Sequence, residues 1–197
     1  MDAENLEKHI QDIITNDIFK LFTNGKFKEA KLLLNQLYLN NYDDIRSLYT
    51  RRLLIHNLAW VENKLGDINS SKKHIKMIKE ELELDSNYIN TNMLDYCLIL
   101  NLYCELFKNE ISLTEYKEIN LFISNYHHQT GNIGRKSVSL ANIFLIEKRW
   151  DELISLILSL KEQNIDEFFI DAILEELEKV NVDIFKKATN LLNGGVF

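Results

Sequence analysis

No proline occurs in the 197 residues of the chain, and this absence constrains the fold more than any other feature of the sequence. Proline is favoured in turns and at sheet edges, so a β-rich or loop-rich chain of this length would normally use it. Long helices joined by short connections can do without it. Since hydrophobic residues make up 46% of the chain and charged residues 27%, the composition also suits a globular core. We therefore expect an all-α protein.

Apolar residues recur at i, i+3, i+4 and i+7 along nearly the whole chain, as they do in amphipathic helices. The breaks carry residues that end and start helices, among them Gly25, Gly66 and Gly131, and the capping box Ser-Leu-Thr-Glu at residues 112–115. The connections are short, so consecutive helices should fold back as antiparallel pairs. The predicted helices span residues 3–23, 27–39, 43–65, 68–83, 87–108, 113–127, 133–147, 150–162, 166–179 and 182–192.

The predicted turns recur at a nearly constant step. Gly25 and Gly66 lie 41 residues apart, and Lys148 lies two further steps of that length beyond Gly66. The intermediate step falls at Phe107, beside another predicted break. Self-similarity of this kind predicts helix pairs that stack, each pair touching mainly its neighbours.

Several segments resemble the tetratricopeptide repeat. Residues 57–60 read Asn-Leu-Ala-Trp, residues 64–67 read Lys-Leu-Gly-Asp, and residues 82–87 read Leu-Glu-Leu-Asp-Ser-Asn. That family places Asn-Leu-Gly/Ala in mid-helix, a Gly-Asp turn after it, and Leu-Glu-Leu-Asp-Pro-Asn at the exit. Residues 26–30 and 140–141 are similar to parts of the same pattern. The resemblance implies an α-solenoid of about five antiparallel helix pairs, wound as a right-handed superhelix.

The chain departs from the family pattern in three respects. The step of 41 residues exceeds the family's usual 34, Asp17 stands at a normally apolar position, and Ser86 replaces the exit proline. Longer-armed repeats of this kind resemble the cytosolic peptide-pheromone receptors of Gram-positive bacteria and their phages. We expect one tetratricopeptide-like domain over residues 1–197, whose terminal pair, residues 165–193, caps the stack or forms a homodimer.

In a tetratricopeptide array the first helices of successive pairs line a concave groove, and the resemblance therefore implies which side chains face a ligand. The predicted groove residues are His56, Trp60, Asn63, Asn101, Glu105, Arg135, Asn142, Phe19 and Phe22. Asparagine amides match the donor and acceptor of a peptide group, and Arg can hold a carboxylate. Alternatives remain open: Trp60 packs between helix pairs, Arg135 pairs with an acid, and the asparagines are ordinary surface residues of an Asn-rich chain.

Composition and motifs oppose several other functions. The net charge of −7 disfavours binding to nucleic acid, and no apolar run is long enough to span a membrane. Cys97 and Cys104 lie seven residues apart in one predicted helix, too far for a disulfide, which favours a cytoplasmic location. Adjacent histidines such as His127 and His128 diverge by about 100° on a helix and do not converge on a metal. Neither a phosphate-binding loop nor a catalytic motif occurs, so we expect no enzyme, metal or cofactor.

The sequence therefore predicts a non-enzymatic scaffold that binds a short peptide or a partner segment in a concave groove, in a regulatory or sensory role. The alternative is a constitutive adaptor, inhibitor or immunity protein that binds its partner through the convex face or the terminal helices. In that case apolar residues such as Phe168, Phe169, Ile184 and Phe185 would be exposed at the end of the chain.

Overall fold

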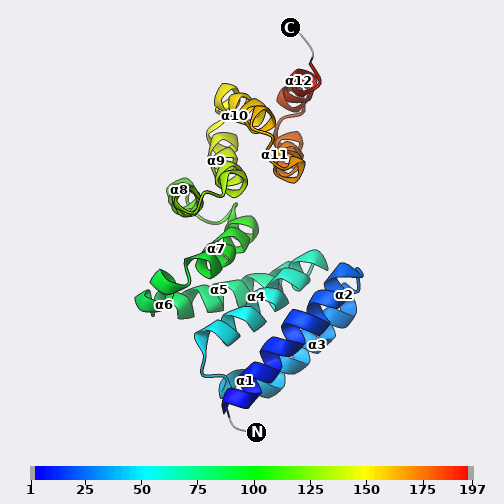
Figure 1. Ribbon diagram of the computed structural model, residues 1–197, viewed down its shortest axis with the longest axis vertical. Helices are drawn as coiled ribbons and strands as arrows, with labels where there is room; N and C mark the ends of the chain where they lie inside the picture. The colour runs from blue at the N-terminus through cyan, green and yellow to red at the C-terminus, as the bar shows by residue number, and fades with distance from the viewer. Residues whose placement is uncertain (1–2, 195–197) are drawn as a thin grey trace. The chain divides into compact units, whose positions relative to one another are not determined.

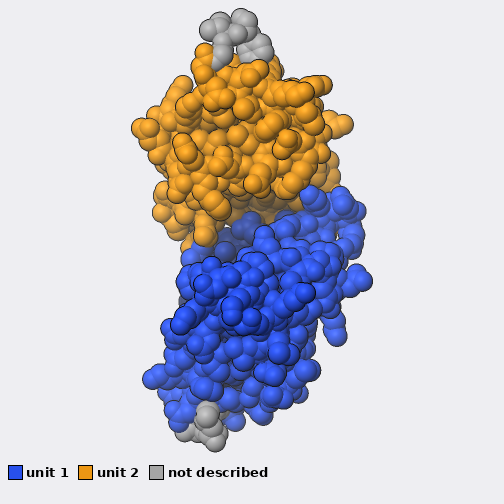
Figure 2. Space-filling model, turned by 90° about the vertical axis from the view of Figure 1, so that its right-hand side faces the viewer, with its two compact units in different colours: residues 1–110 blue, residues 111–197 orange. Residues whose placement is uncertain are grey.

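The computed structural model describes residues 3–194, and within them all regular secondary structure is helical (Figure 1). The all-α prediction is thus confirmed. The chain divides into two compact units, residues 1–110 and residues 111–197, which Figure 2 distinguishes by colour. Each unit has helices that pack on their neighbours, as a helical repeat fold requires. The continuous solenoid over the whole chain remains a prediction.

The first unit begins with one long helical segment followed by packed helices. Its elements are α1 (Ala3–Asp12), a π-helical turn (Ile13–Ile18), α2 (Phe19–Thr23), α3 (Phe27–Asn41), a 3-10 turn (Tyr42–Asp44), α4 (Leu48–Lys64), α5 (Ile68–Glu83), α6 (Ser86–Thr91) and α7 (Met93–Phe107). Helix α4 is central, since it packs against α1, α3, α5 and α7. Helix α4 contributes to two hydrophobic clusters from two of its sides. Leu54 and Leu58 pack with α1 and α3, whereas Ile55 and Ala59 pack with α5 and α7.

The second unit consists of α8 (Leu113–Gln129), α9 (Ile133–Glu147), α10 (Trp150–Glu162), α11 (Glu167–Val180) and α12 (Val182–Leu192). Helix α9 packs against α8, α10 and α11, and α12 packs against α10 and α11. The core includes Ala141, Leu153, Ile157 and Ile173, all fully or almost fully buried. The i, i+4 spacing of Leu153 and Ile157 shows why the apolar stripe in the sequence became the buried face of α10.

Five connections share one turn geometry. Each contains one residue with positive φ: Gly25, Gly66, Gly131, Lys148 or Asn164. At Gly66 the amide donates to the Asn63 carbonyl at 3.0 Å, and the next amide, of Asp67, donates to the Glu62 carbonyl at 2.9 Å. The other four repeat both bonds, which define the Schellman motif and satisfy carbonyls at the helix end. The predicted turns at these positions are confirmed.

The constant step fails at one position. Helix α7 does end at Phe107 as predicted, but no residue of that connection has positive φ, and the Glu110 amide bonds to the Phe107 carbonyl instead. The segment predicted as one helix over 87–108 is also two helices, α6 and α7, joined at Asn92. The backbone of Asn92 has φ −125° and ψ 43°, values outside the helical region, and this interrupts the helical path. This region also matches the repeat pattern poorly in sequence.

The π-helical turn accounts for Asp17. A π turn takes more residues per turn than an α-helix, so it shifts the buried face along the sequence. Ile14 and Ile18 are buried, whereas Asp17 between them is exposed to solvent. The carboxylate that stands at a normally apolar position of the repeat therefore points away from the core and carries no cost of desolvation.

Candidate partner-binding face on α4 and α7

Two polar bridges join α4 to α7. Near the beginnings of the two helices a guanidinium nitrogen of Arg52 lies 2.8 Å from a carboxylate oxygen of Asp95. Near their ends Nδ2 of Asn63 donates to Oε1 of Glu105 at 2.8 Å. Because both bridges join like ends, the helices run side by side in the same direction, as first helices of successive repeats do. Asn101 lies one turn before Glu105 and shares its side of α7.

We term His56, Asn63, Asn101 and Glu105 the α4/α7 face. These are predicted groove residues, and the structure brings Asn63 and Glu105 into direct contact across two helices. Asn101 and Glu105 are exposed, while Asn63 is partly exposed. The Asn63–Glu105 bond leaves the amide oxygen and the second N–H of Asn63, and a second carboxylate oxygen of Glu105, for other partners. Amide and carboxylate groups are thus presented from helical positions whose backbone is fixed by the core beneath.

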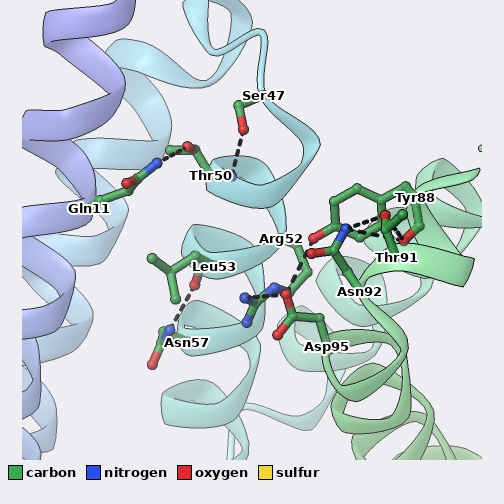
Figure 3. A network of polar contacts seen from close by, with 10 residues as sticks. All are labelled: Gln11, Ser47, Thr50, Arg52, Leu53, Asn57, Tyr88, Thr91, Asn92 and Asp95. Carbon is green, nitrogen blue, oxygen red and sulfur yellow. Dashed lines mark hydrogen bonds and ion pairs between the residues drawn. The ribbon is translucent and has the colours of Figure 1, made fainter.

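Near the beginnings of α4 and α7, around Arg52 and Asp95, lies a polar network that the sequence did not predict (Figure 3). Arg52 is only 5% exposed, its guanidinium stacks over Tyr49 at 5.0 Å, and the Tyr88 hydroxyl donates to Asp95 at 3.4 Å. Within the described residues Nε of Arg52 is buried and has no hydrogen-bond partner. Removing Asp95 would strand a buried charge, so this pair fixes the position of α7 against α4. The sequence feature that could have indicated this network is the i, i+4 spacing of Arg52 and His56, which puts both residues on one side of α4.

The opposite side of α4 is held by bonds to its own backbone and to α1. Gln11 donates to the Thr50 hydroxyl at 2.7 Å, and Ser47 caps the helix by accepting from the Thr50 amide, as Figure 3 shows. The amide of Asn57 donates to the Leu53 carbonyl within the same helix. Asn57 therefore has a structural role, and α4 is anchored on both sides of the α4/α7 face.

The imidazole of His56 is held in its neutral form. Burial, and to a smaller extent the positive charge of Arg52 one turn earlier, lower its pKa from 6.5 to about 4. A neutral imidazole has one donor and one acceptor, which is the same complement as a peptide group. His56 thus adds hydrogen-bonding capacity but no charge to the α4/α7 face at neutral pH.

Trp60 and Phe22 pack against each other between α2, α3 and α4. Their ring centroids are 4.8 Å apart, and Phe27 approaches Trp60 at 5.9 Å. Lys64 lies over the indole at 5.6 Å. The structure thus shows the packing that was the alternative reading of Trp60, and only part of its ring is accessible. Phe19, in contrast, is 63% exposed.

Arg135 and Asn142 belong to the second unit. Asn142 donates to the side-chain oxygen of Asn120 at 3.1 Å, so its amide links α9 to α8. Arg135 is exposed, and no ion pair of its side chain is found among residues 3–194. The predicted common groove that would join Arg135 and Asn142 to the α4/α7 face remains a prediction.

The terminal helices expose less apolar surface than the alternative function predicted. Phe168 is 69% exposed, but Phe169 is partly buried and packs near Gly134 of α9. Ile184 and Phe185 pack against the core of the second unit. Only one of the four residues named for a terminal interface is therefore exposed as expected.

Comparison of the chain with models of protein families, with curated proteins and with solved structures gives no match in any of the three. Among the described helices, none combines the length and the apolar character that crossing a lipid bilayer requires.

Proposed function

We propose that the chain is a cytoplasmic, non-enzymatic scaffold that binds an extended peptide segment along the α4/α7 face, in a regulatory role. The observation that carries the proposal is the pair of bridges that aligns α4 and α7 in parallel, which places Asn63, Asn101 and Glu105 in one accessible group. The helix repeats that this alignment resembles bind peptides in the same place. Cys97 and Cys104 of α7 are buried and form no disulfide within the described residues, which supports a reducing compartment.

The chemistry of the face favours a particular kind of peptide. Asn63 and Asn101 can each bond a backbone carbonyl and amide, which requires an extended chain rather than a helix whose backbone groups are already paired. Glu105 contributes a negative charge on a chain of net charge −7. We therefore expect peptides with at least one Lys or Arg near the position that contacts Glu105.

The experiment selects peptides that bind to the full chain from a displayed random library. The affinity of each selected peptide is then measured by calorimetric titration. Asn101→Ala and Glu105→Gln should each weaken binding about five- to tenfold, the cost of one lost hydrogen bond or exposed charge contact. Trp60 is a poor choice for this test, because its substitution would also disturb the packing with Phe22 and Phe27.

Matched controls come from α5 of the same unit. Asn69→Ala and Glu80→Gln remove the same chemical groups at exposed positions away from the α4/α7 face and should leave affinity unchanged. Selected peptides that bind equally well to the Asn101 and Glu105 variants would contradict the assignment of the face. A library that yields only peptides without a basic residue would contradict the role of Glu105.

A second candidate is an adaptor that uses the terminal helices, and one observation favours it. Phe168 at the beginning of α11 is 69% exposed, and Val180 and Val182 around the α11–α12 connection are 54% and 49% exposed. If these residues form the interface, Phe168→Ser should abolish partner binding and leave the peptide affinity of the α4/α7 face unchanged.

A further inference from the structure

A cavity of about 460 Å³ lies inside the second unit, away from the α4/α7 face. It forms where the end of α8, the first half of α9 and the last turns of α10 meet. Its volume falls in the range of small-molecule sites, roughly 300–1,000 Å³. The inference drawn from it is independent of the function proposed above, because no residue of the cavity belongs to the first unit.

The polar part of the lining is unusual for an acidic protein. His127, His128, Lys136, Ser137 and Gln163 line the cavity, and no Asp or Glu does. The ammonium of Lys136 lies 3.4 Å from Nδ1 of His128, and no carboxylate pairs with it among the described residues. The chain has 30 acidic and 23 basic side chains, so it is acidic as a whole. The cavity differs, because its lining contains a lysine and no Asp or Glu and therefore has a net positive charge.

Two polar residues of the lining are almost completely buried. His127 is 2% exposed and Ser137 is 3% exposed, yet within residues 3–194 neither side chain makes a hydrogen bond. Burial lowers the pKa of His127, with Arg135 adding to the effect, so the ring is neutral and offers one N–H. Neither side chain is sealed from the cavity, since the enclosed polar atoms without a partner among the described residues belong to Arg52 and Glu81, so His127 and Ser137 can bond to whatever occupies the cavity.

The helix terminus does not supply the missing partner. Asn132 caps α9 by accepting from the Arg135 amide, and the Lys136 amide bonds to the Asn132 carbonyl. An anion in the cavity would therefore be held by side chains. Lys136 is the one lysine or arginine of the lining, and a single ammonium matches a monoanion such as a carboxylate better than a phosphate dianion.

Apart from Gly131 and Ser159, whose hydroxyl accepts a hydrogen bond from Gln163, the rest of the lining is apolar. Leu140 of α9 and Leu156 and Leu160 of α10 form it, together with Ile133. A ligand that fills the cavity must therefore combine a charged end with a hydrocarbon body. We propose that the second unit binds a small aliphatic carboxylate, with its carboxylate accepting hydrogen bonds from Lys136 and His127 and its chain lying against the leucines.

The test uses the full chain labelled with 15N, in which the imidazole resonances of His127 and His128 are assigned by single substitution. Hexanoate should shift both sets of resonances saturably and leave those of His9 and His56 unchanged. Lys136→Gln should weaken hexanoate binding about tenfold or more, and Lys136→Arg should restore most of it, because it restores the charge. Lys186→Gln, at an exposed position of α12, is the matched control and should have no effect.

Three comparison probes make the proposal refutable. Hexan-1-ol has the same chain without the charge, hexylammonium has the opposite charge, and inorganic phosphate has no apolar body. Each should bind at least about tenfold more weakly than hexanoate. Equal binding of hexan-1-ol or of phosphate would overturn the proposal, as would saturable hexanoate binding that survives Lys136→Gln. An absence of any saturable shift in a folded protein would show that the cavity holds only water.

Discussion

The contact between Gly134 and Phe169 allows the packing of α9 against α11 to be tested. The effect of Gly134→Ala on the free energy of unfolding should change sign when Phe169 is replaced by alanine. Among the described residues of the second unit, Gly134 is the one glycine within a helix, and a Cβ atom there would lie 2.7 Å from Cγ of Phe169. An alanine gains about 1 kcal/mol over glycine in a helix interior. Forcing a methyl group into a packed site costs about 1–3 kcal/mol. Gly134→Ala should therefore destabilise the second unit by about 1 kcal/mol.

In a Phe169→Ala background the same substitution should stabilise by about 1 kcal/mol, because the clash has gone and the helix propensity remains. The coupling energy between the two positions is then about 2 kcal/mol. Urea unfolding of the four proteins, followed by far-ultraviolet circular dichroism and by the fluorescence of Trp150 in α10, measures it. Phe169 is only partly buried, so the Phe169→Ala protein should retain a measurable transition.

Ser155→Ala at an exposed position of α10 provides the matched control. It should change stability by the same few tenths of a kcal/mol in both backgrounds, since it does not approach Phe169. A coupling energy for Gly134 and Phe169 below about 0.5 kcal/mol would refute the close approach of α9 and α11, because independent sites add within that limit. Stabilisation by Gly134→Ala in the otherwise unchanged protein would refute it as well.

Three further predictions concern turns, burial and pH. Gly66→Ala should destabilise the protein by about 1–2 kcal/mol, because φ is +79° there. Lys148→Gly should stabilise it, because φ is +57° at Lys148. Equal effects of the two substitutions in urea unfolding would contradict this. Ser71→Ala should cost about 1 kcal/mol, since its buried hydroxyl donates to the Ala59 carbonyl at 2.7 Å, and Ser71→Val should cost more through overpacking. Because the pKa of His56 is lower in the folded protein, the unfolded chain binds a proton at a higher pH than the folded chain does. The free energy of unfolding should therefore fall by up to about 3 kcal/mol as pH drops from 6.5 to 4. His56→Gln should flatten this dependence between pH 6.5 and 5.

The helices and most of their ends could be predicted from sequence because their causes are local. The apolar period of each segment and the Gly, Asn and Ser residues at the breaks act within a few residues of one another. Lys148 could be placed in a turn by the repeat, although the sequence alone offers no glycine there to allow its positive φ. The π turn at residues 13–18 and the division at Asn92 could not be predicted, since packing decides where a helix is interrupted.

The candidate face was predicted in part. The positions of Asn63, Asn101 and Glu105 followed from the resemblance to tetratricopeptide repeats, and the structure joins two of them by a hydrogen bond. The Arg52–Asp95 pair and the cavity around His127 and Lys136 were not anticipated, because each depends on residues of different helices meeting. From the sequence, His127 and His128 were expected only not to share a metal ion, and the burial of His127 was not predicted.

The sequence by itself determined that the chain is helical, where the helices end, and which stripe of each is apolar, because those properties depend on neighbours within about one turn. Tertiary structure alone decided which polar side chains are bridged, which are buried without partners, and which face solvent. Those outcomes depend on the distance between helices, and that distance is set by how the apolar stripes interlock rather than by any single segment.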